Sequence, residues 1–400
     1  MKKVKFLIIG AGIIGLASAY QILKKQKNIN LIILEKESEI SQHQTGRNSG
    51  VIHSGLYYKP GSLKAKNCLT GRKDLLNFCE KFNIPTKKCG KVIVATEESE
   101  LDRLYELEKR GKVNKVEGLE IISKEKLNEI EPNVKAIKAL RVPSCAVVDY
   151  LKVAKKLKEQ IEKLGGQIFL NQKVIDIKKE NDEFLIKTQN ETFKTKKLIN
   201  CAGLHSDRIA KMAMPTKKLP LKIIPFRGEY YDIVDEKKDL IKSLVYPVPD
   251  PKFPFLGVHL TRMINDTVHA GPNAVFAFAR EGYTKTNVNM KDLIDSLLYK
   301  GFIKVGFKYW KMGLFEMYRS FSKKAFLKSM QKMLPEIGIN DITPGKAGIR
   351  AQAIDRHGKL VDDFAIERGE NQIHVLNAPS PAATACLSIG KHIANLAIEK

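Results

Sequence analysis

The sequence predicts an α/β protein in which a Rossmann-like domain carries an inserted α+β domain. Two observations lead to this prediction. Residues 4–35 run in the order apolar strand, glycine-rich turn, helix and second strand, which is the order of a dinucleotide-binding βαβ unit. From Pro215 onward, prolines cluster among short strands, which is typical of an antiparallel sheet with exposed edges. After residue 340 the α/β pattern returns.

The first element is the glycine-rich turn GxGxxG, which follows the strand Val4–Ile9. Gly10 permits a tight turn, Gly12 lets the backbone approach a pyrophosphate, and Gly15 lets helix and strand pack closely. Unpaired N–H groups at the start of the following helix favour an anion. Glu35 ends the second strand, 20 residues after Gly15, where it is placed to bind a ribose hydroxyl. The unit therefore predicts a bound dinucleotide.

A secretory signal peptide is the alternative interpretation of the same residues. The chain starts with basic residues, stays uncharged from Phe6 to Leu23, and contains a small-residue site at Ala17-Ser18-Ala19. Cleavage there would remove the first strand and its turn and leave Glu35 without its partners. Glycines at turn spacing also argue against a membrane span. We therefore expect a cytoplasmic protein.

Composition indicates an ordinary globular core with an unusual charge. The 400 residues are 43% hydrophobic, which allows one large domain or two of medium size. The six cysteines form no CxxC pair and no cluster with metal-ligand spacing, so we expect buried thiols and no metal site. The net charge of +25 indicates an acidic substrate, an anionic membrane or nucleic acid as a partner, or merely a lysine-rich composition.

The middle of the chain alternates helices and strands. A polar loop at 45–58 holds three glycines within ten residues, which suits a flat ligand. Ser123 is an expected N-cap, and Gly165-Gly166 is expected to end the helix 149–164. A turn at Ala202-Gly203 forms a second junction of strand, glycine and helix. The expected helices are 63–82, 98–110, 123–130, 149–164 and 206–214, and the expected strands are 91–95, 167–170, 173–178, 183–188, 191–194 and 198–203.

The second half of the chain contains the expected antiparallel strands 226–234 and 255–262, followed by helices in 283–334. The helical segment has 11 Lys and Arg against 3 Asp and Glu, hence +8, and ten aromatic residues that include the single Trp. Three hypotheses fit it: single-stranded nucleic acid binding, contact with an anionic inner membrane near quinone, or packing on the substrate domain. We favour either of the last two over nucleic acid. Strands 346–352 and 373–377 and a helix ending at Ile398 complete the chain.

Several motifs along the chain carry a family resemblance. The glycine turn with Glu35, the loop 45–55, the turn at Ala202-Gly203 and the strand 345–352 resemble FAD oxidoreductases of the D-amino-acid oxidase superfamily. More specific runs resemble the L-2-hydroxyglutarate dehydrogenase (oxidase) family within it. These runs are NSGVIHSG at 48–55, PFRGEYY at 225–231, LGVHLTR at 256–262, GPNA at 271–274 and NAPSPAAT at 377–384.

The resemblance implies FAD as cofactor and an enzyme acting on a CH–OH donor. It implies oxidation of L-2-hydroxyglutarate, a small dicarboxylate, to 2-oxoglutarate by hydride transfer to flavin N5, with quinone or oxygen as acceptor. Glycerol 3-phosphate and secondary amines are alternative substrates in the same superfamily. We expect an FAD-binding domain from residues 1–90, 145–214 and 340–400, and a substrate domain from residues 91–144 and 215–339.

The expected cofactor-binding residues come from every part of the FAD-binding domain. Lys346 and the loop 380–384 are expected to place positive charge and N–H dipoles near the flavin. The whole set is Gly10, Gly12, Ile13, Ile14, Gly15, Glu35, Lys36, Thr45, Gly46, Asn48, Ser49, Gly50, Val51, Val174, Ala202, Gly203, Ser380, Pro381, Ala382, Ala383 and Thr384.

Catalysis needs cationic anchors for two carboxylates and a base for the hydroxyl proton. Arg227, Arg262 and Arg350 are the candidate anchors, and we expect two of the three to face the flavin. His259 and His53 are the candidate bases, since an imidazole titrates near neutral pH. His259 and Arg262 are three residues apart on an expected strand, so their side chains should point to opposite faces. His53 is the alternative, placed beside the flavin ring.

Overall fold

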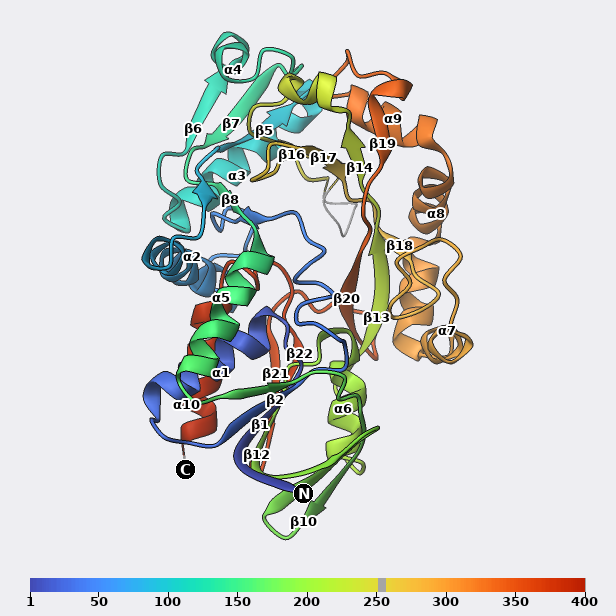
Figure 1. Ribbon diagram of the computed structural model, residues 1–400. Helices are drawn as coiled ribbons and strands as arrows, with labels where there is room; N and C mark the ends of the chain where they lie inside the picture. The colour runs from blue at the N-terminus through green and yellow to red at the C-terminus, as the bar shows by residue number, and fades with distance from the viewer. Residues whose placement is uncertain (251–256, 400) are drawn as a thin grey trace.

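The computed structural model describes residues 1–250 and 257–399 and confirms the predicted fold class. A Rossmann-like sheet forms one part of the molecule, and a second sheet, largely antiparallel, forms the other (Figure 1). The strands of the first sheet are β1 (Lys2–Ile9), β2 (Leu31–Leu34), β9 (Gln167–Phe169), β10 (Val174–Glu180), β11 (Glu183–Thr188), β12 (Thr192–Asn200), β21 (Ala365–Gly369) and β22 (Gln372–Asn377).

The first sheet has the parallel centre that a dinucleotide fold needs. β1 pairs in parallel with both β2 and β12, and β12 pairs in parallel with β22. The predicted strands 191–194 and 198–203 are one continuous strand, β12, whose first half pairs with β11 and whose second half pairs with β22. The residues of β1 from Phe6 to Ile9 are all buried, because helices or strands cover both faces.

Helices cover the first sheet on both faces (Figure 1). α1, α5 and α10 lie together on one face, with α2 packed against α10, and α6 lies on the other. Ser123 caps α4 as predicted, and Asp149 caps α5; each accepts a hydrogen bond from a backbone N–H. The helices are α1 (Ile13–Lys25), α2 (Leu63–Lys81), α3 (Leu101–Val113), α4 (Lys124–Ile130), α5 (Tyr150–Lys163), α6 (Ser206–Ala213), α7 (Met290–Leu297), α8 (Lys300–Phe321), α9 (Lys323–Gln331) and α10 (Cys386–Ile398).

The second sheet combines two distant segments of the chain. β5 pairs in parallel with β15, although about 150 residues separate them, and the other pairings in the sheet are antiparallel. α9 contributes Phe326, Leu327 and Met330 to the core of this part. The strands are β5 (Lys91–Ala95), β6 (Glu120–Ser123), β7 (Lys138–Val142), β14 (Tyr231–Ile233), β15 (Leu244–Pro247), β16 (His259–Arg262), β17 (Val268–Gly271) and β19 (Ile342–Pro344).

A long ribbon joins the two parts. β13 (Leu221–Gly228) pairs along its whole length with β20 (Gly348–Asp355), and β18 (Val275–Phe276) completes this sheet. β13 belongs to the expected substrate domain and β20 to the expected FAD-binding domain, so the ribbon connects both. A further small sheet consists of β3 (Val51–Ile52), β8 (Ala146–Val148) and β4 (Thr86–Lys87). The domain division itself stays a prediction.

Two expected strands differ from the structure. The strand expected at 226–234 is interrupted at Glu229 and Tyr230, so β13 and β14 enter different sheets. Of the strand expected at 255–262, β16 begins at His259, while residues 255 and 256 lie outside the described residues. All six cysteines are free; five are buried as expected, and Cys89 is half-buried. Within 1–250 and 257–399, no helix is long and apolar enough to cross a membrane.

Candidate active site

A cavity of about 1140 Å³ runs from the glycine turn to the space between the two sheets. At one end it is lined by Gly10, Glu35 and Lys36, and at the other by His53, His259 and Arg350. Pockets for small ligands usually measure roughly 300–1,000 Å³. The cavity can therefore hold a large elongated ligand together with a small substrate.

The glycine turn at the first end has the geometry of a pyrophosphate site. Gly10 has φ +103°, and a Cβ at Gly15 would overlap the carbonyl oxygen of Gly10. α1 has Gly12 as its N-cap, with no capping side chain and no acidic residue in its first turn. The N–H of Ile13 donates to Oγ1 of Thr45 at 3.0 Å. Apart from the N–H of Ile13, the first N–H groups of α1 and its positive dipole charge can bind an anion in the cavity.

Glu35 lies at the carboxyl end of β2 and supports the turn as well as lining the cavity. One carboxylate oxygen accepts from the N–H of Ala11 at 2.8 Å, and the other accepts from the N–H of Glu37 at 3.1 Å. Each oxygen keeps a second lone pair for a further donor. The carboxylate can therefore hold the turn and bind a ribose hydroxyl at the same time.

The loop 45–53 is tied to the C-terminal segment at the middle of the cavity. The N–H of His53 donates to Oγ1 of Thr384 at 3.1 Å, and the buried hydroxyl of Tyr150 lies 3.1 Å from the carbonyl oxygen of Val51. Asn48 accepts from the N–H of Gly50 at 2.8 Å. Gly50 has φ +64°, and a Cβ there would lie 2.8 Å from the carbonyl oxygen of Val148. The backbone of Gly50 thus packs directly against that of Val148, which leaves a smooth wall suited to a flat group.

Most of the expected cofactor residues line this cavity. Gly15, Gly46 and Gly50 do not, because their lack of a side chain serves close packing behind the wall. Lys346 is also absent from the lining. Those that line it are Gly10, Gly12, Ile13, Ile14, Glu35, Lys36, Thr45, Asn48, Ser49, Val51, Val174, Ala202, Gly203, Ser380, Pro381, Ala382, Ala383 and Thr384.

The substrate end of the cavity holds both candidate histidines. Nδ1 of His259 lies 2.9 Å from the carbonyl oxygen of Gly257, which can only accept, so Nδ1 carries the proton. Nε2 of His259 is then the unprotonated nitrogen. Burial is the main cause that lowers the pKa of His259 to about 3; the Gly257 carbonyl opposes this shift, and Lys91 and Arg350 contribute to it. His259 is therefore neutral near pH 7.

His53 lines the same end of the cavity. Its Nε2 is 3.3 Å from Oγ of Ser380, in the loop expected to approach the flavin. Burial is the main cause that lowers its pKa to about 3, and Lys91, His259 and Lys64 add to it. Both histidines are thus neutral, but only His259 has a backbone partner that fixes its tautomer.

Of the three candidate arginines, only Arg350 lines the cavity. Arg350 on β20 is the cross-strand partner of Phe226 on β13, and both line it, because directly paired residues share one face of a sheet. Arg227 follows Phe226 and points the other way. It is 4% exposed and is bound to Glu229 and to the carbonyl oxygen of Thr284. Arg227 is therefore no substrate anchor.

Arg262 also lies outside the cavity lining. It lies three residues after His259 on β16, and the alternation of the strand turns it to the opposite face. Its guanidinium binds Asp266 at 3.0 Å, Asp239 at 3.1 Å and the carbonyl oxygen of Ile241 at 2.9 Å. Of the three candidate arginines, the structure thus places Arg350 in the cavity and binds the other two to carboxylates outside it.

Sequence reasoning missed several side chains at the substrate end. Tyr246 stacks on His259, and Tyr230, Tyr57, Tyr58 and Lys64 also line the cavity. The hydroxyl of Tyr57 is buried and has no hydrogen-bond partner among the described residues, so a polar ligand group would satisfy it. The available signal was the pair of tyrosines in the glycine-rich loop.

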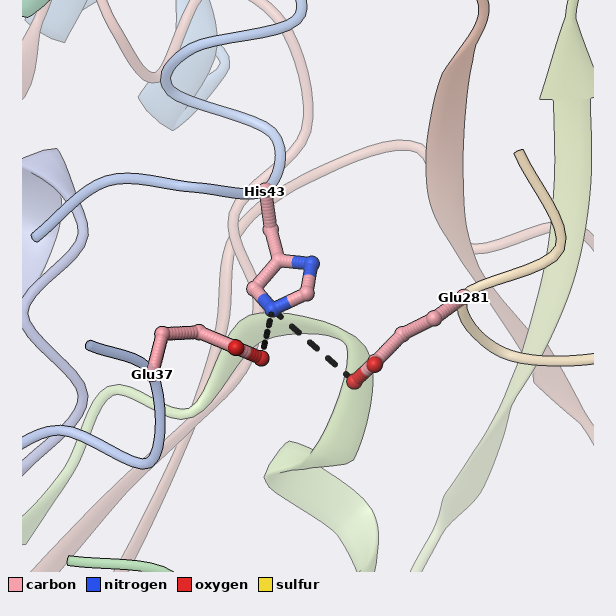
Figure 2. A group of neighbouring side chains, drawn as sticks. All are labelled: Glu37, His43 and Glu281. Atoms are coloured by element: carbon pink, nitrogen blue, oxygen red, sulfur yellow. Dashed lines mark hydrogen bonds and ion pairs between the residues drawn. The ribbon is translucent and has the colours of Figure 1, made fainter. Parts of the chain in front are cut away.

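A charged cluster beside the first end brings Glu37, His43 and Glu281 together (Figure 2). Their ligand atoms all lie within 4.8 Å, which is close enough for a metal ion. However, the ammonium of Lys36 binds both Glu37 and Glu281, the latter at 2.7 Å. His205 also binds Glu281 at 2.7 Å. Lys36 thus supplies the positive charge that a metal would bring, and the cluster is an ion-pair network.

Known proteins are similar to this chain in sequence over nearly its whole length. The model of the FAD dependent oxidoreductase family matches residues 5–396. L-2-hydroxyglutarate dehydrogenase of Indibacter alkaliphilus is 52% identical over 394 residues, which are 98% of each chain. The mitochondrial L-2-hydroxyglutarate dehydrogenase of Homo sapiens is 42% identical over 97% of this chain and 87% of its own.

Solved structures give the same fold. L-alpha-glycerophosphate oxidase from Mycoplasma pneumoniae, reduced with dithionite and with FAD bound, superposes with a TM-score of 0.81 at 26% identity, over 100% of this chain and 96% of its own. Glycine oxidase from Geobacillus kaustophilus superposes with a TM-score of 0.74 at 16% identity, over 99% of this chain and 95% of its own. The second likeness concerns the fold alone.

Proposed function

Because the chain belongs to the FAD dependent oxidoreductase family, with FAD as its cofactor, we propose that it oxidises L-2-hydroxyglutarate to 2-oxoglutarate. The observation that carries this proposal is the 52% identity to a relative named L-2-hydroxyglutarate dehydrogenase over 98% of both chains. The cavity supports it, because neutral His259 and cationic Arg350 line the same end. A base and a carboxylate anchor are what oxidation of a 2-hydroxy acid requires.

Different parts of the cavity would bind different parts of the cofactor and the substrate. When bound, FAD supplies the acceptor for the hydride that leaves the substrate Cα, at N5 of its flavin ring. The start of α1 and Glu35 hold the pyrophosphate and ribose. The loop 380–384 and His53, which line the cavity together, would hold the flavin ring. The geometry of the cavity thus favours chemistry between His259 and the loop 380–384.

His259 is the base in this proposal. Nδ1 donates to the carbonyl oxygen of Gly257, which leaves the lone pair of Nε2 to accept the proton of the substrate hydroxyl. Loss of that proton and of the hydride from Cα converts the alcohol to the ketone. Arg350 holds the carboxylate next to the reacting carbon, since its planar fork binds both oxygens.

Anaerobic reduction of the purified holoenzyme tests the proposal. L-2-hydroxyglutarate should bleach the visible absorbance of the flavin in wild type. His259→Asn should slow this step at least about 100-fold, which is the usual contribution of a positioned base. His53→Asn is the matched comparison and should slow it less. Absence of bleaching in wild type would contradict the proposed substrate.

A second candidate substrate follows from one comparison. The glycerophosphate oxidase from Mycoplasma pneumoniae is 26% identical over the whole chain, and a guanidinium such as that of Arg350 also binds phosphate. The same assay with L-glycerol 3-phosphate, sarcosine and 2-hydroxy acids separates the classes. Faster bleaching by glycerol 3-phosphate would favour this second candidate.

We further propose that α8 docks on an anionic membrane, with quinone as acceptor. α8 is kinked at Tyr309, and on each side of the kink its exposed apolar residues recur every three or four positions. Phe307 is 80% exposed and Trp310 is 55% exposed. The other exposed apolar residues of α8 are Ile303, Leu314, Phe315, Tyr318 and Phe321.

The charges around this face favour a bilayer. Lys300, Lys304, Lys308 and Lys311 are interleaved with the apolar residues of α8. α7 packs against α8 and adds exposed Met290, Ile294, Leu297 and Leu298. An amphipathic helix with aromatic and lysine side chains is typical of binding in the plane of an anionic membrane surface. In Figure 1 both helices lie on an outer edge of the molecule.

Sedimentation with vesicles tests the membrane proposal. The holoenzyme should sediment with vesicles rich in phosphatidylglycerol and less with phosphatidylcholine vesicles. Phe307→Ser with Trp310→Ser should abolish sedimentation while leaving flavin reduction by substrate unchanged. Binding to neither type of vesicle would contradict the membrane proposal, and oxygen would then be the favoured acceptor.

A further inference from the structure

The active site lacks one of the two cationic anchors that the sequence led us to expect. Arg350 lines the substrate end of the cavity, whereas Arg227 and Arg262 are bound elsewhere. A second cation, Lys64, lines the same cavity. Given the proposed function, we propose that Lys64 is the second carboxylate anchor and that it binds the carboxylate remote from the reacting carbon.

The start of α2 holds Lys64 in place. Ser62 caps the helix and accepts from the N–H of Ala65 at 3.2 Å. The carboxylate of Asp363 accepts from the N–H groups of Leu63 and Lys64, both at 3.2 Å. Asp363 is in turn fixed by Asn377, whose amide donates to its carbonyl oxygen at 2.9 Å. The backbone of Lys64 is thus fastened to the segment that follows β20.

The ammonium of Lys64 is available to a ligand. It lies 5.6 Å from the centre of the Tyr58 ring, and within 1–250 and 257–399 no carboxylate lies within ion-pair distance of it. Burial lowers the pKa of Lys64, Asp362 and Asp363 raise it, and Arg350 lowers it. Arg350 and Lys64 are therefore close enough to repel each other. Asp362 lines the same cavity and attracts both cations, so a substrate carboxylate would relieve the repulsion that Asp362 leaves.

The electrostatic effects of the two cations on the two histidines favour a different carboxylate for each. Arg350 acts electrostatically on His259, the proposed base, so it belongs with the carboxylate next to the reacting carbon. Lys64 acts on His53, which lies beside the loop 380–384. The substrate would then lie across this end, with its second carboxylate at Lys64. The ammonium is a point charge and suits a carboxylate that needs no fixed orientation.

The other nearby cations do not fit this role. Lys91 is 3% exposed and lies behind the tyrosines, with its ammonium 3.9 Å from the centre of the Tyr246 ring, and it does not line the cavity. Arg47 stacks on Tyr283 at 4.0 Å and donates to the carbonyl oxygen of Ala347. Lys64 is therefore the cation that can distinguish a dicarboxylate from a monocarboxylate.

The experiment compares Lys64→Met with Lys66→Met in the holoenzyme. Lys66 lies in the same helix turn but is exposed and outside the cavity, so it is the matched control. Lys64→Met should lower kcat/KM for L-2-hydroxyglutarate about 30-fold, mainly through KM. It should change kcat/KM for L-2-hydroxybutyrate, which lacks the second carboxylate, less than about threefold. Lys64→Arg should restore part of the loss, since it restores the charge.

A binding measurement separates this proposal from the proposed function. Glutarate and butyrate are titrated into the oxidised holoenzyme, and perturbation of the flavin spectrum reports Kd without turnover. Lys64→Met should raise the Kd for glutarate and leave the Kd for butyrate unchanged. If L-2-hydroxyglutarate reduces the wild-type flavin but Lys64→Met leaves glutarate binding intact, the anchor is overturned and the function stands. If wild type is not reduced, the function fails, and glutarate binding still decides the role of Lys64.

Discussion

The ring of Tyr246 stacks on the ring of His259, with centroids 4.0 Å apart and planes inclined by 24°. The two residues come from the neighbouring strands β15 and β16, which pair antiparallel. The ammonium of Lys91 lies 3.9 Å from the centre of the Tyr246 ring. The orientation of the proposed base is therefore set by an aromatic side chain on the neighbouring strand as well as by the carbonyl oxygen of Gly257.

The first prediction concerns this stack. Tyr246→Leu removes the ring face that orients His259, and small misplacements of reacting groups cost up to roughly 100-fold in rate. We expect at least about a 10-fold lower rate constant for anaerobic flavin reduction. Tyr246→Phe keeps the ring and should stay within about threefold of wild type. Equal rates for the Leu and Phe variants, at equal flavin content, would contradict an orienting role.

The second prediction concerns pH and stability. Burial lowers the pKa of His259 to about 3, whereas in the unfolded chain it is near 6.5. Between these values the unfolded state binds more protons, so the free energy of unfolding falls as pH falls below about 6.5. The slope from this residue is at most about 1.4 kcal/mol per pH unit. Urea unfolding of the holoenzyme at about pH 7 and about pH 5 measures it.

His259→Asn provides the comparison for the pH dependence. Unfolding of wild type at about pH 5 takes up a proton at His259, and unfolding of the variant does not. The free energy of unfolding of the variant should therefore fall less steeply toward about pH 5. His53 and His374, whose pKa values burial lowers to about 3 and about 4, retain part of the slope. An unchanged slope in the variant would show that His259 is protonated in the folded protein.

The third prediction concerns the ion-pair network around Glu281. Lys36 and His205 both bind one oxygen of Glu281 at 2.7 Å, and all three residues line the cavity. Burial lowers the pKa of His205, so His205 is neutral near pH 7 and Lys36 is the cation that Glu281 neutralises. Glu281→Gln would leave Lys36 with less negative charge beside it and should loosen this wall. We expect FAD to dissociate about 10-fold faster, measured by recovery of flavin fluorescence after dilution. Glu336→Gln, at an exposed position, should leave the rate unchanged.

The fourth prediction compares two glycines in helices. A Cβ at Gly15 would overlap the backbone of Gly10, so Gly15→Ala should prevent stable FAD binding and lower Tm by several degrees. A Cβ at Gly313 in α8 would meet no atom of the described residues within 4 Å, so Gly313→Ala should raise stability by about 0.5–1 kcal/mol. Thermal unfolding with and without added FAD measures both. A stable, yellow Gly15→Ala protein would contradict the close approach.

The sequence predicted those local features that depend on a single residue type, such as glycine in a tight turn or serine at an N-cap. Only neighbouring residues were needed to predict the three glycines of the first turn, the N-cap Ser123 and the strand order of residues 4–35. The break at Glu229 and Tyr230 did not follow from local pattern. It depends on β13 pairing with β20 and β14 pairing with β17, and both partners are distant in the sequence.

The catalytic side chains were harder to predict, because their direction depends on strand alternation and on partners far away. Once Phe226 faces the cavity, Arg227 must face away, and Glu229 then neutralises it. The sequence shows neither fact without the register. The sequence alone does not single out Lys64 among the 69 basic residues. Its position in the cavity depends on Asp363, about 300 residues later, which accepts a hydrogen bond from its backbone N–H at the start of α2.

The pairing of distant strands also sets the order in which the protein can fold during synthesis. β1 lies between β2 and β12, and β12 needs β22, so the central sheet is incomplete until Asn377 has left the ribosome. β5 must likewise wait for β15. Apolar strands therefore remain exposed on the nascent chain for most of translation. Expression yield should thus depend on chaperones that hold the emerging chain, and separate expression of the two halves should give insoluble protein.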